Sequence, residues 1–326
     1  MTLAQREVGA SRRKAGTIDA VLTAYMQSDT FTKGLADATR QSRRSILENF
    51  ADTQAPSGQR YGEKGILTLQ RRHVQAIFEG MSHDKKRNWI KALRGLMVYA
   101  IAKEIRTDDP TRGVTVERAA KSSGYMTWMP EQVEQYRARH PLDTTARLAL
   151  ELLLNIAARR YDAHEIGPQH LIISNRDGVK KLCWRPHKTL RTSGKLLKIK
   201  VLPTLQAALD AMPKPERGTA VALAFLTNEN GKAFASADSF GLRFAKWCDE
   251  AGLQPVMCDD GKVRNYRAHG LRKAALTAAA HAGCTLHELM ALSGHASPTE
   301  LQKYLEEVEQ ERMADRAMDK LEAAEG

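Results

Sequence analysis

Residues 267–304 read RAHGLRKAALTAAAHAGCTLHELMALSGHASPTELQKY and hold the most informative pattern in the chain. His269 and Arg272 are three residues apart, so they share one face at the start of a predicted helix. A glycine-containing turn then brings His295, and Tyr304 follows nine residues later inside a further helix. Each short match is common by chance, but their conjunction in this order is much rarer.

The rest of the chain divides into segments of different character. Residues 17–110 place apolar side chains at helical spacing, which predicts a small all-α domain. Residues 1–16 are polar and basic and predict a flexible N-terminus. Residues 111–128 mix glycine, serine and charges and predict a linker to a second domain over residues 129–326.

The predicted helical domain carries many basic side chains on its outward positions. As a set they favour a phosphate-contacting face, although any one of them alone is better explained as solvated surface. The candidates for DNA binding are Arg40, Arg43, Arg44, Lys85, Arg87, Lys91 and Arg94.

The second domain combines helices with a small β-region. An apolar run predicts a helix over residues 144–161. Residues 179–184 and 195–202 predict two strands of a hairpin, joined by a long basic tip. The chain after Pro203 reads mostly as helix. The fold class is therefore mainly α with a small β-sheet or hairpin in the second domain.

The H-x-x-R, G-H and Y elements resemble the C-terminal motif of the tyrosine recombinase, or phage integrase, family. The resemblance covers most of the chain from about residue 17. It implies a helical core-binding domain over residues 17–110, and an α+β catalytic domain over residues 129–326. The implied activity is that of a site-specific DNA recombinase that cuts and rejoins DNA strands.

The family needs a further arginine early in the catalytic domain, and Arg159 occupies that place. Family members usually read T-G-x-R there, with an acidic residue three positions later that Asp162 matches as a supporting residue. This chain has Ile156 and Ala157 in place of the customary Thr and Gly. Because Arg160 is adjacent, the assignment could shift by one residue.

The family also has a catalytic lysine on its β-hairpin. Lys188-Thr189 resembles the K-T of integrase hairpins and is the favoured candidate. Lys195 stays open as the alternative, because it lies eight residues before Pro203, a spacing familiar in shorter hairpins.

Phosphoryl transfer explains why these residue types occur together. Two guanidinium groups, Arg159 and Arg272, can bind non-bridging phosphate oxygens bidentately, and His295 is expected to hydrogen-bond the phosphate. By its family role, Tyr304 is the nucleophile that forms a 3′-phosphotyrosine, with His269 as its base. Lys188 would protonate the departing 5′-hydroxyl, and neither ATP nor a metal is required.

Composition fits this interpretation without proving it. The chain has 326 residues, and 50 lysines and arginines against 38 acidic residues give a net charge of +12, which favours a polyanionic partner. No secretory signal or transmembrane run is present, and the four scattered cysteines favour a reducing compartment. No P-loop occurs, and His287-Glu-Leu-Met-Ala291 fails as a zinc motif, so no cofactor or metal is expected.

The resemblance also implies partners. We expect double-stranded DNA, a homotetramer on two DNA sites, no membrane association, and a cytoplasmic, nucleoid-associated protein of prokaryotic or phage origin. Ser297-Pro-Thr-Glu300 predicts a capping box that opens the helix of Tyr304. The C-terminal helix 305–326 carries an apolar stripe that could dock on its own domain or on a neighbour.

Two alternatives remain at this point. A type IB topoisomerase-like enzyme shares the chemistry but relaxes DNA, and the separate helical domain disfavours it. A non-catalytic DNA-binding protein that retains the fold would be expected to have lost part of the motif.

Overall fold

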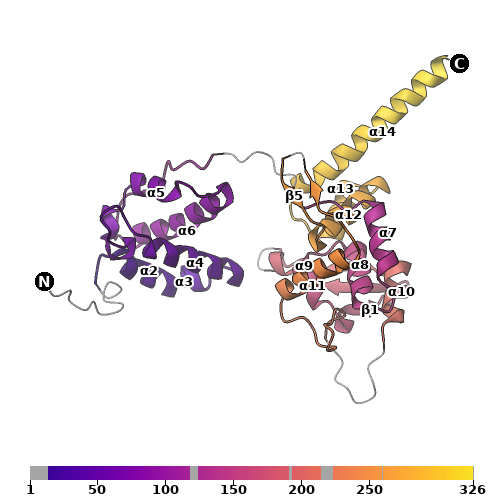
Figure 1. Cartoon of the computed structure of the whole chain (residues 1–326), viewed down its shortest axis with the longest axis horizontal. Coiled ribbons are helices and arrows are strands. Elements are labelled where there is room, and N and C mark those ends of the chain that lie inside the picture. The colour runs from indigo at the N-terminus through magenta and orange to yellow at the C-terminus, as the bar shows by residue number, and fades with distance from the viewer. Residues whose placement is uncertain (1–13, 118–123, 191–192, 214–222, 259, 326) are drawn as a thin grey trace. The chain divides into compact units, whose positions relative to one another are not determined.

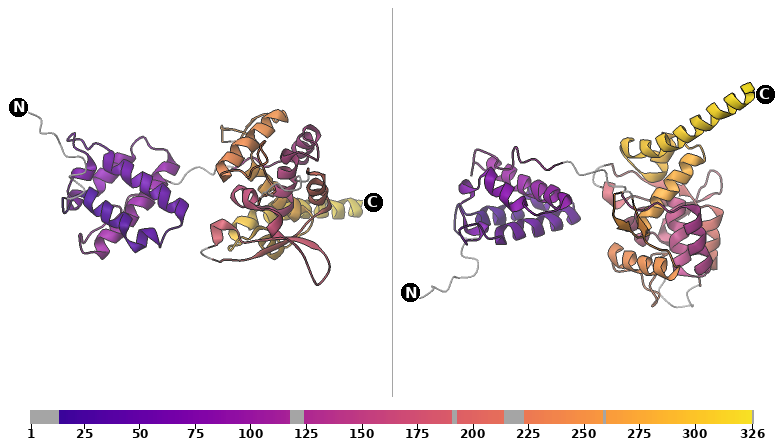
Figure 2. Two further views of the ribbon diagram at one scale, coloured as in Figure 1. Left: turned by 90° about the horizontal axis from the view of Figure 1, so that it is seen from below. Right: turned by 45° about the horizontal axis from the view of Figure 1, so that its top comes forward.

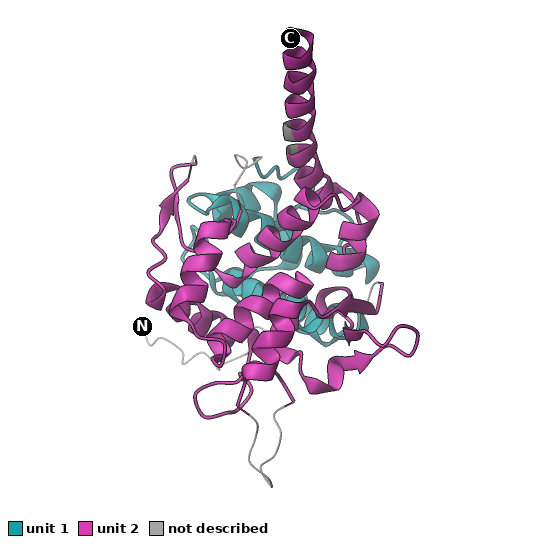
Figure 3. Ribbon diagram, turned by 90° about the vertical axis from the view of Figure 1, so that its right-hand side faces the viewer, with its two compact units in different colours: residues 1–121 teal, residues 122–326 magenta. Residues whose placement is uncertain are grey.

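The computed structural model of the chain describes residues 14–117, 124–190, 193–213, 223–258 and 260–325. The chain divides into two compact units, unit 1 over residues 1–121 and unit 2 over residues 122–326 (Figure 3). Among the described residues, no helix is both long and apolar enough to cross a membrane.

Unit 1 is built from α-helices and short 3-10 turns (Figure 2). Apolar side chains from these helices form one core, which includes Tyr25, Phe50 and Leu93. The α-helices are α2 (Ile18–Gln27), α3 (Asp29–Thr32), α4 (Asp37–Asp52), α5 (Arg71–Phe78) and α6 (His83–Ala102). Two 3-10 turns, η1 (Tyr61–Glu63) and η2 (Ile66–Thr68), lie between α4 and α5.

The two folded units extend into both ends of the expected linker over residues 111–128. Thr111 and Val114 are buried in unit 1, where Val114 joins the core. Trp128 is buried in the core of unit 2, and its indole N–H donates to the carbonyl of Arg267 at 3.1 Å. These anchors belong to the two folded units. Residues 118–123 of the expected linker, and residues 1–13 of the expected flexible N-terminus, lie outside the described residues.

Unit 2 is mainly helical with two small antiparallel sheets (Figure 1). Its helices are α7 (Pro130–Arg139), α8 (Thr145–Ile156), α9 (Arg160–Glu165), α10 (Pro203–Ala211), α11 (Ala237–Glu250), α12 (Ala268–His281), α13 (Leu286–Ser293) and α14 (Thr299–Glu325). The larger sheet has the order β1-β2-β3, with β1 (Leu171–Ile173), β2 (Lys180–Trp184) and β3 (Leu197–Lys200). This architecture confirms the expected fold class.

The structure corrects the sequence interpretation at three places. The expected hairpin exists, with Leu182 opposite Ile199, but β1 joins it as a third strand. The region after Pro203 contains a second sheet of two-residue strands, β4 (Val256–Met257) and β5 (Val263–Arg264). The expected helix over residues 144–161 ends at Ile156 and is followed by the separate helix α9.

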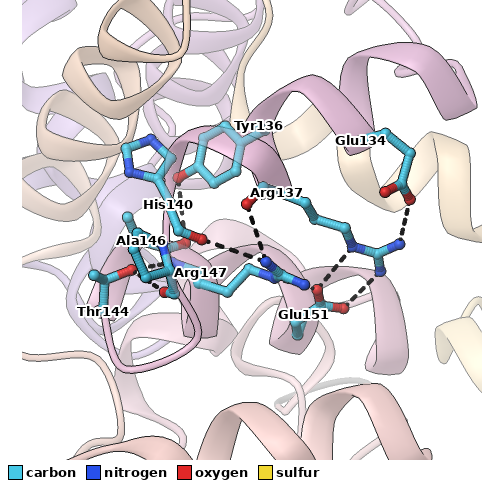
Figure 4. A network of polar contacts seen from close by, with 9 residues as sticks. Glu134, Tyr136, Arg137, His140, Thr144, Ala146, Arg147 and Glu151 are labelled. Atoms are coloured by element: carbon cyan, nitrogen blue, oxygen red, sulfur yellow. Dashed lines mark hydrogen bonds and ion pairs between the residues drawn. The ribbon is translucent and has the colours of Figure 1, made fainter.

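The core of unit 2 is centred on α8 and its neighbours. Nine of the twelve residues of α8 are buried, including Glu151 with its carboxylate. This buried charge is compensated by Arg137 and Arg147, whose guanidinium nitrogens lie 2.7–2.9 Å from its oxygens (Figure 4). The Arg137–Glu151 pair joins α7 to α8, whereas the Arg147–Glu151 pair lies within α8.

The C-terminal helix α14 begins against the body of unit 2 and then extends away from it (Figures 1 and 3). Leu301 and Val308 are buried against α12 and α13. Further along, the apolar stripe emerges, because Met313, Met318 and Leu321 are all more than half exposed.

Candidate functional site

A cleft of about 590 Å³ opens in unit 2, and it gathers all six residues expected to be catalytic. They reach it from the α8–α9 turn, the β2–β3 connection, α12, the turn after α13, and α14. The lining residues are Gly124, Tyr125, Arg159, Lys188, His269, Arg272, Lys273, Leu276, His295, Glu300, Lys303 and Tyr304.

Arg272 forms the buried floor of the cleft. It is 5% exposed and lies on α12. Its guanidinium donates to the carbonyls of Ala157 and Ser293, the latter at 2.9 Å. Burial and the neighbouring Arg159 lower the pKa of Arg272 to about 10, which still leaves it charged at neutral pH. This side chain is therefore held rigidly as a buried cation.

Arg159 stands at the N-cap of α9, just after the turn that ends α8. The turn is made by Ala157 in the left-handed conformation, with φ 46°, at the position where the family customarily has glycine. Within the described residues, Nη1 of Arg159 is buried without a hydrogen-bond partner. An unsatisfied buried guanidinium N–H is costly, so an anionic group in the cleft would stabilise this donor.

The neighbours of Arg159 resolve which arginine belongs to the cleft. Arg160 turns to α11 and lies 2.5 Å from the carboxylate of Asp238. Asp162, the expected supporting residue, accepts a hydrogen bond on its Oδ1 from the backbone N–H of His187 at 2.8 Å. Burial raises the pKa of Asp162, against the opposing effects of the His187 N–H and Arg159. The buried carboxylate thus fixes the β2–β3 connection.

Of the two candidate lysines, Lys188 lies in the cleft. It belongs to the 3-10 turn η4 (His187–Thr189), between β2 and β3. Lys195 is exposed on the same connection and is not among the lining residues. Lys188, in the first part of the predicted basic tip, therefore lies beside the other cations of the cleft.

His269 and the chain entering unit 2 form one wall of the cleft. The rings of His269 and Tyr125 have centroids 4.5 Å apart. A Cβ on Gly270 would come within 2.0 Å of the carbonyl oxygen of Met126, so only glycine allows this close approach. Desolvation by the surrounding protein, and the charges of Arg272, Arg159 and Lys188, lower the pKa of His269.

His295 follows the left-handed Gly294 that ends α13. Its Nδ1 lies 2.7 Å from the hydroxyl of Ser293, and Nη2 of Arg272 is 3.4 Å from both ring nitrogens. Burial and the two arginines lower its pKa to about 4, so the ring is neutral at pH 7. The Glu300 carboxylate, expected in a capping box, lies 3.5 Å from Nε2 of His295.

Tyr304 reaches the cleft from the second turn of α14. Its side chain is partly buried and contacts the apolar cluster of α12, α13 and α14. Among the described lining residues, the cations Arg159, Lys188, Arg272, Lys273 and Lys303 share the cleft with the single carboxylate of Glu300. Such an excess of positive charge suits a phosphate diester. No group of three metal-ligating side chains occurs in the part of the chain that the structure describes.

The basic residues expected to bind DNA lie on α4 and α6 of unit 1. Arg43 and Lys91 line a groove of about 420 Å³ between the two helices. Arg87 and Arg94 are exposed on α6, while Arg44 and Lys85 lie over the rings of Phe31 and Trp89. Arg40 is engaged locally, with the carbonyl of Thr32 and the carboxylate of Asp37.

Sequence reasoning missed the aromatic and lysine neighbours of the site. Tyr125 was assigned to the linker, and Tyr161, Lys273 and Lys303 were not singled out. Lys273 directly follows Arg272, and Lys303 directly precedes Tyr304, so proximity to the motif was the available signal. No sequence signal marked Tyr125 as a neighbour of His269.

Comparison with known proteins places this geometry in a family. Residues 130–311 match the model of the phage integrase family. The chain is 23% identical to tyrosine recombinase XerC of Actinobacillus succinogenes, in an alignment that covers 73% of this chain and 85% of the relative.

Solved structures show the same fold. A lambda integrase tetramer bound to a Holliday junction matches with a TM-score of 0.69 and 13% identity, covering 92% of this chain and 81% of that one. A Tn1549 transposon integrase in complex with a circular intermediate DNA matches with a TM-score of 0.63 and 16% identity, covering 90% and 99%. The family model spans more than half of the chain and includes the whole motif from His269 to Tyr304. The chain therefore belongs to the phage integrase family of tyrosine recombinases, enzymes that break and rejoin DNA strands.

Proposed function

We propose that this protein is a site-specific recombinase in which Tyr304 attacks a DNA phosphodiester. The Tyr304 oxygen forms a bond to phosphorus, and the bond from phosphorus to the 5′-oxygen breaks. The phenolic proton passes to His269, and Lys188 gives a proton to the departing 5′-oxygen. Attack by a new 5′-hydroxyl on the 3′-phosphotyrosine reverses these steps and joins strands, so bond energy is conserved without ATP or a metal.

The observation that carries this proposal is the buried, unpartnered Nη1 of Arg159 in the cleft that Tyr304 lines. A non-bridging phosphate oxygen would satisfy this donor. Arg272 sits on the same cleft with its guanidinium already anchored, so it needs no reorganisation when charge develops on the phosphate. The arrangement suits stabilisation of a transition state better than loose retention of DNA.

The protonation states support the assigned proton transfers. The lowered pKa of His269 keeps its ring neutral, as a base must be before it accepts a proton. The pKa of His295, about 4, leaves it neutral as well, so it is suited to hydrogen-bond the phosphate rather than to pair with it as a cation.

A suicide substrate tests the nucleophile. We expect the wild-type protein to form a covalent, protease-sensitive adduct on nicked DNA that carries its site, and Tyr304→Phe to form none. Retained DNA binding by Tyr304→Phe is the control for folding. An adduct that persists in this variant would remove Tyr304 from the role, and no adduct from the wild type would favour a non-catalytic DNA-binding protein.

A 5′-bridging phosphorothiolate tests the acid, because a thiolate leaves without protonation. Lys188→Ala should cleave ordinary DNA slowly and the phosphorothiolate at close to the wild-type rate. Lys195→Ala, on the same connection but outside the cleft, is the matched control and should cleave both substrates normally. Rescue of Lys195→Ala instead would exchange the two assignments.

We further propose that unit 1 binds duplex DNA through the groove between α4 and α6 and the cations beside it. Arg87 and Lys91 are exposed on α6, where they can neutralise phosphates. Arg87→Ala and Lys91→Ala should each weaken binding and reduce the salt slope by about 0.9 for each phosphate that is no longer neutralised. An unchanged slope in both variants would contradict this assignment.

A homotetramer on two DNA sites is proposed from the extended α14, whose exposed Met313, Met318 and Leu321 suit contact with a second copy. The lambda integrase tetramer on a Holliday junction supports this assembly by its likeness in fold. Met313→Glu with Met318→Glu should reduce the four-subunit complex on native gels while leaving single-site binding intact. Glu322→Gln, an exposed polar change on the same helix, is the control.

A further inference from the structure

The turn η4 places Lys188 at the edge of the cleft, and it is itself exposed. His187, Lys188 and Leu190 are all open to solvent. The backbone bonds within the turn, from Thr189 to Pro186 and from Leu190 to His187, are 3.1 and 3.3 Å long and only local. Contacts from outside the turn therefore help to set the backbone position of Lys188.

Two such contacts converge on His187, the residue before Lys188. The imidazole of His187 stacks on the ring of Tyr161, with centroids 4.3 Å apart and planes 29° apart. The backbone N–H of His187 donates to Oδ1 of Asp162 at 2.8 Å. Tyr161 and Asp162 are consecutive residues of α9, so one short helix holds both sides of His187.

The same helix begins directly after Arg159. Tyr161 is supported in turn by His164, whose Nδ1 lies 2.5 Å from the Tyr161 carbonyl and whose ring stands edge-on, 5.1 Å from the Tyr161 ring. Helix α9 therefore connects Arg159, its N-cap residue, to the turn that carries Lys188. Tyr161 itself is 43% exposed and absent from the unit 2 core, so packing of the core does not explain it.

We propose that Tyr161 is a positioning residue for the acid step: its stack on His187 holds Lys188 where it can protonate the leaving 5′-oxygen. This inference rests on the proposed role of Lys188. Tyr161 is not assigned a contact with the substrate, and its hydroxyl is not required. The ring surface carries the effect, because offset aromatic stacking restricts the turn without a hydrogen bond.

Single-turnover cleavage of ordinary and 5′-phosphorothiolate suicide DNA tests the inference. Tyr161→Ala should cleave ordinary DNA about tenfold more slowly, the upper range for loss of one aromatic pair. It should cleave the phosphorothiolate at the wild-type rate, because that leaving group needs no acid. Tyr161→Phe keeps the ring and should match wild type on both substrates.

Controls separate positioning from a general structural role. Gln169→Ala changes an exposed side chain shortly after the same helix and should leave both rates unchanged. Should Tyr161→Ala fail to fold, as judged by thermal melting, His187→Ala removes the same stack from the other side and must show the same rescued defect. The variant that combines Tyr161→Ala with His187→Ala should cleave ordinary DNA no more slowly than either single variant. Each single change already removes the same ring stack.

The failure of this inference is distinguishable from failure of the proposed function. If the phosphorothiolate rescues Lys188→Ala but leaves Tyr161→Ala slow, Lys188 remains the acid and the positioning role is overturned. Weakened DNA binding by Tyr161→Ala with equal loss on both substrates would likewise overturn it and indicate a DNA contact. If Lys188→Ala itself is not rescued, the acid assignment fails, and the role of Tyr161 falls with it.

Discussion

The guanidinium of Arg272 donates a hydrogen bond from Nη1 to the carbonyl oxygen of Ala157, which lies 115 residues earlier in the chain. Ala157 ends α8 with φ 46° and ψ 33°, a left-handed conformation that residues other than glycine seldom adopt. The turn at Ala157 sets the direction of this carbonyl. It also sets the backbone position of Arg159, two residues later. One backbone turn thus locates both arginines of the cleft.

Ala157 should therefore tolerate glycine but not a β-branched residue. Ala157→Val should lower the free energy of unfolding by about 2 kcal/mol, because a β-branched residue is strongly disfavoured in this conformation. Ala157→Gly should be close to neutral, since relief of about 1 kcal/mol of backbone strain offsets loss of a buried methyl group worth about 0.8 kcal/mol. Urea unfolding measures both, and a valine variant as stable as wild type would contradict the argument.

Arg272→Lys should separate cleavage from DNA binding. A single ammonium cannot donate to two carbonyls and a phosphate in the fork geometry of a guanidinium, so cleavage should fall at least about 100-fold. Binding should stay near the wild-type level, because the exposed cations of unit 1 do not depend on this residue. Gel shift and suicide-substrate assays measure the two quantities. A parallel collapse of binding would show that Arg272 acts mainly in affinity.

Gly270→Ala should disrupt the wall of the cleft. The added Cβ would lie 2.0 Å from the Met126 carbonyl oxygen and 2.9 Å from Cδ1 of Trp128, so backbone must move. We expect a loss of about 3 kcal/mol in the free energy of unfolding, at the upper end for overpacking. Gly65→Ala is the matched control, since a Cβ there meets its nearest atom at 3.6 Å. Equal stability of the two variants would refute this steric account.

Removing the Tyr125 ring should shift the pH dependence of cleavage. Desolvation, followed by the charges of Arg272 and Arg159, lowers the pKa of His269. Tyr125→Ala exposes the imidazole to water, so its pKa should rise toward 6.5 and more of the base should be protonated in mild acid. The acidic limb of the rate profile should therefore move to higher pH.

Tyr125→Phe is the matched control for this shift. It keeps the ring and should retain the wild-type profile. Single-turnover rates between pH 5 and 8 provide the comparison, on a substrate concentration that saturates binding for each variant. An identical acidic limb in Tyr125→Ala would mean that Tyr125 does not govern the ionisation of His269.

Much of the secondary structure can be predicted from the sequence because it depends on local patterns of apolar residues. The 3.6-residue period predicted the helices of both units, and the alternation around Leu197 and Ile199 predicted a strand. The strands β4 and β5 have two residues each, too few for any alternation to be recognised. The break at Ala157 was hidden because alanine is a strong helix former.

The order of residue types from His269 to Tyr304 was enough to indicate the family and a phosphoryl-transfer site. Only the tertiary structure decided between neighbours: Arg159 faces the cleft while Arg160 pairs with Asp238, and Lys188 enters the cleft while Lys195 does not. It also showed that Asp162 accepts a hydrogen bond from the backbone N–H of His187 while it lies within electrostatic reach of Arg159. Local periodicity records which face of an element is apolar, whereas a pairing between residues 25 or 115 positions apart depends on how separate elements pack.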